Sequence, residues 1–135
     1  MMKDLKYLMS YSIAFMAFLG ISIGGFYNYL AVIYTFVFIP VLEVLVKRSD
    51  EKYTEQEKAN RLLDPFFDIL LYLNIPIVFG IFFFSLDKLN LATSISDIVG
   101  IILSASIVMA TNGINVGHEL GHRRSLFART CSKLL

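Results

Sequence analysis

The chain is poor in three residue types that often carry structural or chemical information. Its 135 residues include no tryptophan, one cysteine and two histidines. A single cysteine, Cys131, excludes an intrachain disulfide framework and is compatible with a reducing compartment. No internal repeat or low-complexity segment is visible. The two histidines, His118 and His122, lie four positions apart, so any histidine chemistry is confined to one short stretch.

Apolar side chains, in contrast, are abundant. Hydrophobic residues make up 56% of the chain and its mean hydropathy is +0.66, which is too apolar for an ordinary soluble domain of this length. The formal net charge of only +1 gives no indication of a nucleic-acid partner. Charged residues concentrate at 43–68 and from 118 onward, with long apolar runs between them. This pattern predicts an all-α integral membrane protein that is embedded in the lipid bilayer.

The apolar runs predict four transmembrane helices, at about 8–25, 29–46, 68–86 and 95–124. Lys3 and Lys6 before the first run also resemble the start of a signal peptide. The second run follows almost at once, however, and no good cleavage site separates the two. We therefore expect an uncleaved first helix that ends in a tight turn at Gly24 and Gly25.

Two prolines and one carboxylate mark features inside these runs. Pro40 should bend the second helix, and Pro76 should kink the third. Glu43 has two interpretations. It is either an interfacial carboxylate paired with Lys47, four residues later, or a polar group that faces the bundle interior.

The orientation of the helices follows from the basic residues. The 47–67 connection is the only long hydrophilic one, and Thr54-x-x-Glu57 predicts a short helix in it from about 55 to 63. With both termini and this connection in the cytoplasm, only Lys88 falls on the other side of the membrane. The cytoplasmic side then receives eleven basic residues: Lys3, Lys6, Lys47, Arg48, Lys52, Lys58, Arg61, Arg123, Arg124, Arg129 and Lys133.

Both histidines lie in a stretch that directly continues the fourth apolar run, Asn112-Gly-Ile-Asn-Val-Gly-His-Glu-Leu-Gly-His122. On a helix that advances about 100° per residue, one side carries Asn115, His118, Glu119 and His122, with Asn112 at its edge. Another side carries glycines at four-residue spacing, which let a neighbouring helix approach closely: Gly113, Gly117 and Gly121. One side is therefore suited to packing and the other to polar chemistry.

Two histidines one helical turn apart can share a metal centre. Either one alone would be an ordinary hydrogen-bonded side chain, but the pair with a carboxylate between them, at a membrane boundary, favours a metal site. The same residues match H-E-x-x-H, the zinc hydrolase pattern in which Glu119 would be the general base. An intramembrane zinc metalloprotease is therefore an alternative. The basic residues that follow, however, lead out of the bilayer.

The stretch NGINVGHELGHRRS resembles the first histidine box of the membrane-bound alkane 1-monooxygenases, members of the integral-membrane fatty acid desaturase and hydroxylase superfamily. The resemblance is specific over about 112–124 and weak over the preceding helices. It implies that His118 and His122 are iron ligands and that Glu119 orients them. We expect Asn112 and Asn115 to orient the ligands as well, rather than to bind metal.

The later histidine boxes of that family, of the kind E-H-x-x-G-H-H and H-x-x-H-H, are absent. Two imidazoles cannot by themselves hold a di-iron centre, so we expect residues 1–135 to be the N-terminal part of one di-iron oxygenase domain, a larger helical bundle. Alone, this part should be inactive.

The resemblance implies a non-haem di-iron enzyme of the bacterial inner membrane. Such an enzyme inserts one oxygen atom of O2 into the terminal C–H bond of an alkane and reduces the other to water, with electrons from rubredoxin or ferredoxin. Three alternatives stay open: a desaturase or lipid hydroxylase of the same superfamily, the zinc protease, and a small membrane protein that handles metal or docks a partner.

Overall fold

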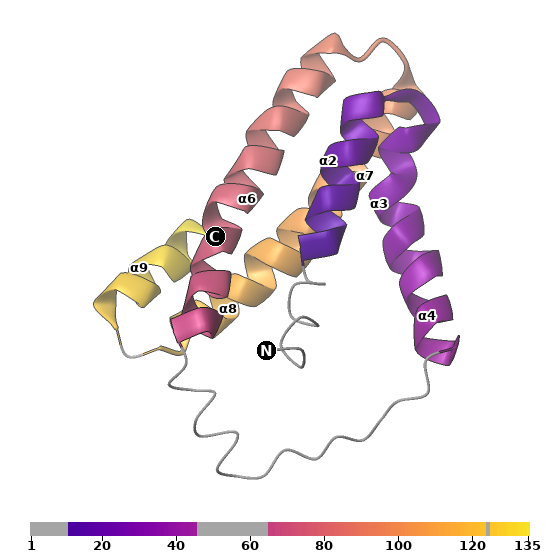
Figure 1. Cartoon of the computed structure of the whole chain (residues 1–135). Helices are drawn as coiled ribbons and strands as arrows, with labels where there is room; N and C mark the ends of the chain where they lie inside the picture. The colour runs from indigo at the N-terminus through magenta and orange to yellow at the C-terminus, as the bar shows by residue number, and fades with distance from the viewer. Residues whose placement is uncertain (1–10, 46–64, 124) are drawn as a thin grey trace.

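The computed structural model describes residues 11–45, 65–123 and 125–135. These residues form helices and contain no strand (Figure 1). In chain order the elements are α2 (Ser12–Ile23), η3 (Gly25–Tyr29), α3 (Leu30–Ile33), η4 (Tyr34–Phe38), α4 (Ile39–Leu45), α6 (Pro65–Leu91), α7 (Ile95–Val108), η5 (Met109–Ile114), α8 (Asn115–Gly121) and α9 (Leu126–Leu134). The predicted all-α fold is confirmed for this part of the chain.

Three continuous helical stretches have the length and composition of membrane spans. They are Gly25–Leu45 with 21 residues, Asp68–Leu91 with 24 and Ile95–Gly121 with 27. About 20 helical residues are needed to cross the hydrocarbon core of a bilayer. The described part of the first predicted span, α2, has only 12 residues, and positions 8–10 lie outside the described residues. The structure therefore supports three of the four predicted spans.

Helices that follow one another in the chain run antiparallel across the bundle (Figure 1). α2 and α6 lead toward one end of the bundle, where the chain turns at Gly24–Gly25 and again at 92–94, and we call this the turn end. α4 and α8 finish at the other end, which also holds α9 and the start of α6, and we call it the histidine end. Between the two ends, α2 packs with small side chains, Ala14 and Ala17, which allow close approach of neighbouring helices.

The turn end is built around glycine. Gly24 and Gly25 have φ angles of 82° and 61°, which residues other than glycine adopt only with strain. The predicted turn at these residues is therefore confirmed. A methyl group on Gly20 would clash with the Tyr27 carbonyl oxygen, and one on Gly100 would lie 2.7 Å from Asn28 Cβ. The segment after the turn therefore lies against α2 on one side and α7 on the other.

Hydrogen bonds between the helices stabilise the turn end. The Asn28 amide donates to Asp97 Oδ1 at 2.9 Å, and the Ser104 hydroxyl donates to the Asn28 carbonyl at 2.5 Å. Ser94 caps α7: its hydroxyl accepts the Asp97 N–H at 3.0 Å and donates to the Asp97 carboxylate at 2.7 Å. Such a cap satisfies an N–H that would otherwise lack a partner at the start of a helix.

Pro40 and Pro76 both lie inside helices, α4 and α6, and the predicted bend and kink at them stay predictions. Residues 34–38, which end two positions before Pro40, form a π-helical segment. A π turn moves hydrogen-bond pairing on by one residue, which accommodates the missing N–H of a proline. Pro76 lies inside α6 without ending it, and this helix continues to Leu91, beyond the predicted boundary of 86.

Two further predictions concern the segment between α4 and α6. Glu43 is exposed near the end of α4. Its predicted partner Lys47 lies outside the described residues, as does the short helix predicted at 55–63.

Candidate metal-binding site

The histidine stretch ends a continuous helical segment of 27 residues. Helical structure runs from Ile95 through α7, the π-helical η5 and α8 to Gly121. His122 follows as the C-cap, and its N–H bonds to the His118 carbonyl at 3.3 Å. The predicted boundary of 124 was wrong, because the chain leaves the helix at His122 and reaches extended geometry at Ser125 before α9 begins.

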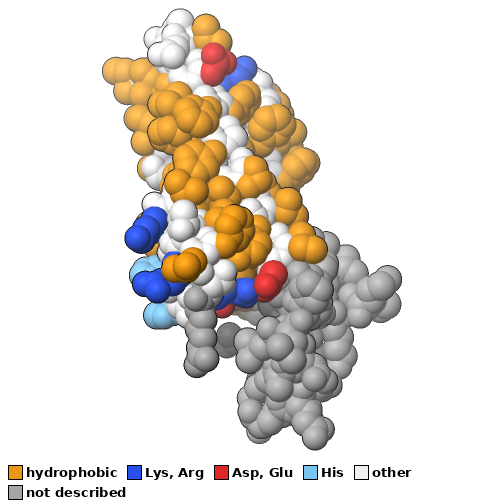
Figure 2. Space-filling model, turned by 90° about the vertical axis from the view of Figure 1, so that its left-hand side faces the viewer, with side chains coloured by type: hydrophobic (Ala, Val, Ile, Leu, Met, Phe, Trp, Pro, Cys, Tyr) orange, Lys and Arg blue, Asp and Glu red, His pale blue; other side chains and the backbone are white. Residues whose placement is uncertain are grey.

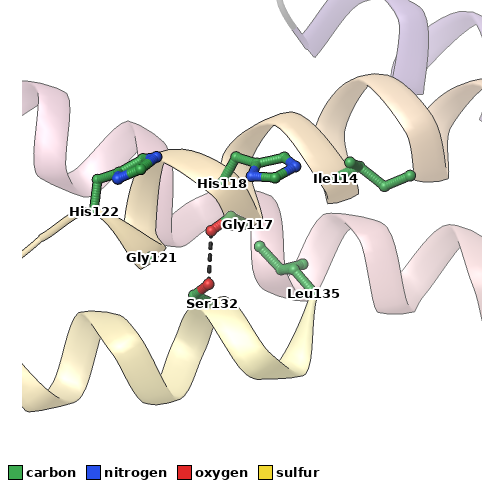
Figure 3. Close-up of a pocket in the computed structure, with 7 residues that line it drawn as sticks. All are labelled: Ile114, Gly117, His118, Gly121, His122, Ser132 and Leu135. Carbon is green, nitrogen blue, oxygen red and sulfur yellow. Dashed lines mark hydrogen bonds between the residues drawn. The ribbon is translucent and has the colours of Figure 1, made fainter.

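Both histidine side chains lie on the same side of this helix end (Figure 3). His118 and His122 are exposed. Together they border an open groove of about 370 Å³, which is also lined by Ile114, Gly117, Gly121, Ser132 and Leu135. The predicted shared side is therefore present, and both imidazoles are accessible to a ligand or metal ion.

The glycines form the wall on which α9 packs. Ideal Cβ positions on Gly117 and Gly121 would lie 3.5 Å from Leu135 Cβ and 3.0 Å from Ser132 Oγ. The Ser132 hydroxyl donates to the Gly117 carbonyl at 2.7 Å (Figure 3). Gly113 faces α6 instead, with Val78 Cγ1 3.7 Å from its ideal Cβ position. The predicted close packing is confirmed, on two different partner helices.

Three residues were expected to orient the histidines. Asn112 is 2% exposed, and its amide donates to Asn74 Oδ1 of α6 at 2.8 Å. The Asn74 amide in turn donates to the Leu70 carbonyl at 2.9 Å. Asn115 and Glu119 are exposed, as the histidines are. Asn112 therefore helps to join the histidine helix to α6, and the predicted roles of all three toward a metal stay predictions.

An ion pair also holds the end of this helix. Arg123 Nη1 bonds to Asp68 Oδ1, with the two side chains 28% and 44% exposed. Asp68 lies in the first turn of α6, where a carboxylate is favoured by the helix dipole. Sequence reasoning did not identify Asp68, Ser132 or the helix that carries Ser132. The position of Asp68 at the border between charged and apolar sequence was the available signal.

The donor set fits part of a metal centre. Imidazole nitrogen is a suitable ligand for iron or zinc, and both imidazoles face open space where ligands from elsewhere can enter. Among the described residues, no three His, Cys, Asp or Glu side chains come together to hold a metal ion. The described part of this chain therefore offers two nitrogen ligands.

Comparisons of the chain with protein-family models, with curated proteins and with solved structures find no match.

Proposed function

We propose that this chain is the N-terminal part of a membrane non-haem di-iron monooxygenase that hydroxylates the terminal carbon of alkanes. One observation carries the proposal: His118 and His122 lie exposed on one side of a helix end that directly continues an apolar span. That placement suits a metal site at the membrane boundary, where an apolar substrate can arrive from the bilayer. The histidine-box pattern of the sequence then favours iron over zinc.

The chain's own residues would hold and orient the site. His118 and His122 supply two imidazole nitrogens, and the remaining ligands come from outside this pair. α9 fixes the backbone of the histidine helix through the Ser132–Gly117 hydrogen bond, and the Asp68–Arg123 ion pair fixes its end. When bound, two irons would supply the activation of O2, with electrons delivered by a rubredoxin or ferredoxin in the cytoplasm.

The location of the site follows from the same proposal. The protein lies in the bacterial inner membrane with the histidine end toward the cytoplasm. Of the basic residues that the structure describes, Arg123, Arg129 and Lys133 lie at this end and Lys88 at the other. A cytoplasmic electron carrier would then have access to the groove beside the histidines.

A metal titration tests the histidine pair. Purified chain in detergent should bind Co²⁺ weakly, with a visible spectrum that titrates with added metal, because two imidazoles give an incomplete ligand set. His118→Ala and His122→Ala should each abolish the spectrum. Thr130→Ala changes an exposed residue of α9 and serves as the control that keeps it. An unchanged spectrum in both histidine variants would refute the metal site.

Activity tests then distinguish the enzyme classes. In the protein as its gene encodes it, we expect two irons, alkane hydroxylation with a rubredoxin donor, and loss of turnover in either histidine variant. Glu119→Gln should lower activity or iron retention by about 10–100-fold, the usual cost of losing a group that orients a ligand. Desaturation of an acyl chain would assign the protein to another branch of the superfamily. Zinc-dependent peptide cleavage would support the protease, and metal binding without turnover would leave a binding protein.

A further inference from the structure

α9 is an amphipathic helix that sequence analysis did not predict. One side of it packs on the bundle: Ala128 and Cys131 are buried in a cluster with Leu120 of α8. The ring of Phe127 also lies 5.3 Å from that of Tyr72, in α6. α9 is thus held against both the histidine helix and α6, at the histidine end of the bundle (Figure 1).

A second side of α9 is apolar and largely exposed, with the edge contact of Phe127 to Tyr72 as its link to the bundle. Phe127 and Leu134 are 66% and 57% exposed. They are seven residues apart and so project in nearly the same direction from the helix. This direction adjoins the buried side that holds Ala128 and Cys131.

The third side of α9 is basic. Arg129 and Lys133 are exposed, lie four residues apart and therefore project together. They lie about 100° to 160° from Phe127 and Leu134 around the helix. No acidic residue occurs between Leu126 and Leu135. Figure 2 shows Lys and Arg side chains grouped beside the histidines, at one end of a face that is otherwise mostly hydrophobic.

From this arrangement we infer that α9 lies in the membrane surface and binds anionic lipid headgroups. Phe127 and Leu134 enter the boundary between headgroups and acyl chains, and Arg129 and Lys133 contact phosphate groups. A helix with aromatic and aliphatic side chains on one side and basic ones on another is typical of such interfacial binding. The inference rests on the proposed membrane location, and it adds a lipid contact directly beside the histidine groove.

Tryptophan fluorescence can test this arrangement cleanly, because the chain contains no tryptophan. We suggest three single variants in vesicles that contain a brominated phosphatidylcholine, which quenches emission from within the bilayer. Phe83→Trp replaces an exposed side chain of α6 and reports on the span. Phe127→Trp reports on the apolar side of α9, and Lys133→Trp on its basic side. We expect strong quenching for Phe83→Trp and Phe127→Trp, and weaker quenching for Lys133→Trp.

The pattern separates the lipid contact from the membrane location. No quenching of Phe83→Trp would overturn the membrane location and the lipid contact with it. Quenching of Phe83→Trp without quenching of Phe127→Trp would overturn only the lipid contact. In that case, protection of Phe127→Trp from aqueous acrylamide would indicate a protein cover, and exposure to acrylamide would indicate a helix in solvent.

The role of the basic side needs a separate measurement. Adding phosphatidylglycerol to the vesicles should shift the Phe127→Trp emission to shorter wavelength, as α9 binds the surface more closely. Combining Phe127→Trp with Arg129→Gln and Lys133→Gln should remove this shift. Lys88→Gln, at the turn end, is the matched control and should leave the shift intact. Equal shifts in both backgrounds would overturn the assignment of a headgroup contact to Arg129 and Lys133.

Discussion

The two ends of the bundle use polar side chains in opposite ways. At the turn end Asn28 and Ser104 are 2% and 0% exposed and bond across helices, although Asn28 Oδ1 lacks a hydrogen-bond partner in the described residues. At the histidine end His118, Glu119 and His122 are exposed beside an open groove. Polar groups that hold helices together form hydrogen bonds with one another and are then not available to a ligand. Polar groups that serve a ligand must stay accessible, and the exposed histidines of the proposed site meet that requirement.

The largest expected effect comes from breaking the turn end. Gly20→Ala places a methyl group against the Tyr27 backbone, which has to move, so we expect a loss of about 1–3 kcal/mol in the free energy of unfolding. Gly80→Ala is the matched control, since no atom lies within 4 Å of its ideal Cβ position. That change should be neutral or should stabilise the helix by up to about 1 kcal/mol. Denaturation in mixed micelles measures both, and equal stabilities would contradict the tight packing at Gly20.

A smaller effect is expected where the histidine helix is bonded to α6. A double-mutant cycle with Asn74→Leu and Asn112→Leu isolates the amide–amide hydrogen bond from other changes. Interhelical hydrogen bonds in membranes average about 0.6 kcal/mol and reach about 1.7 kcal/mol, so the coupling energy should fall in that range. The same unfolding assay gives the four stabilities. A coupling energy of zero would show that the two amides do not support each other.

The smallest effect belongs to the histidine end itself. Arg123→Gln removes the ion pair with Asp68, which is partly exposed and therefore contributes about 1 kcal/mol or less. Added salt should reduce the difference between this variant and the parent protein. Asp68→Asn should cost about as much and give no further loss when combined with Arg123→Gln. A salt-independent loss larger than that at Gly20 would reverse the contrast between the two ends.

The parts of the fold that depend on local pattern could be predicted from the sequence. Apolar runs gave the long helices, paired glycines gave the turn at 24–25, and four-residue spacing gave the shared side of His118 and His122. Each of these depends on residues close together in the chain. Gly117 and Gly121 also indicated a close helix neighbour, because glycine destabilises the interior of a helix and is usually found there where it allows another helix to approach.

What escaped prediction depends on residues far apart in the chain. The Asn74–Asn112 and Asp68–Arg123 pairs join positions more than 30 residues apart, and spacing along the sequence carries no trace of them. α9 was missed for a different reason. It is short and polar on one side, so a search for apolar runs passed over it. The four-span topology and the metal itself stay predictions.

The π-helical segment at Met109–Ile114 also determines which direction the histidines face. An α-helix continued from buried Val108 would bring His122 back to within about 40° of the buried side. A π turn contains one residue more than an α-helical turn, so every later side chain points about 100° further back around the helix axis. This rotation places both histidines on the side opposite Val108. The same rotation returns Leu120, which is 0% exposed, to the buried side. The site is therefore sensitive to sequence length as well as composition. One residue lost from this segment would convert the π turn to α-helix and leave the histidines facing the same way, whereas one residue added would leave every existing side chain intact and still turn the histidines toward the bundle.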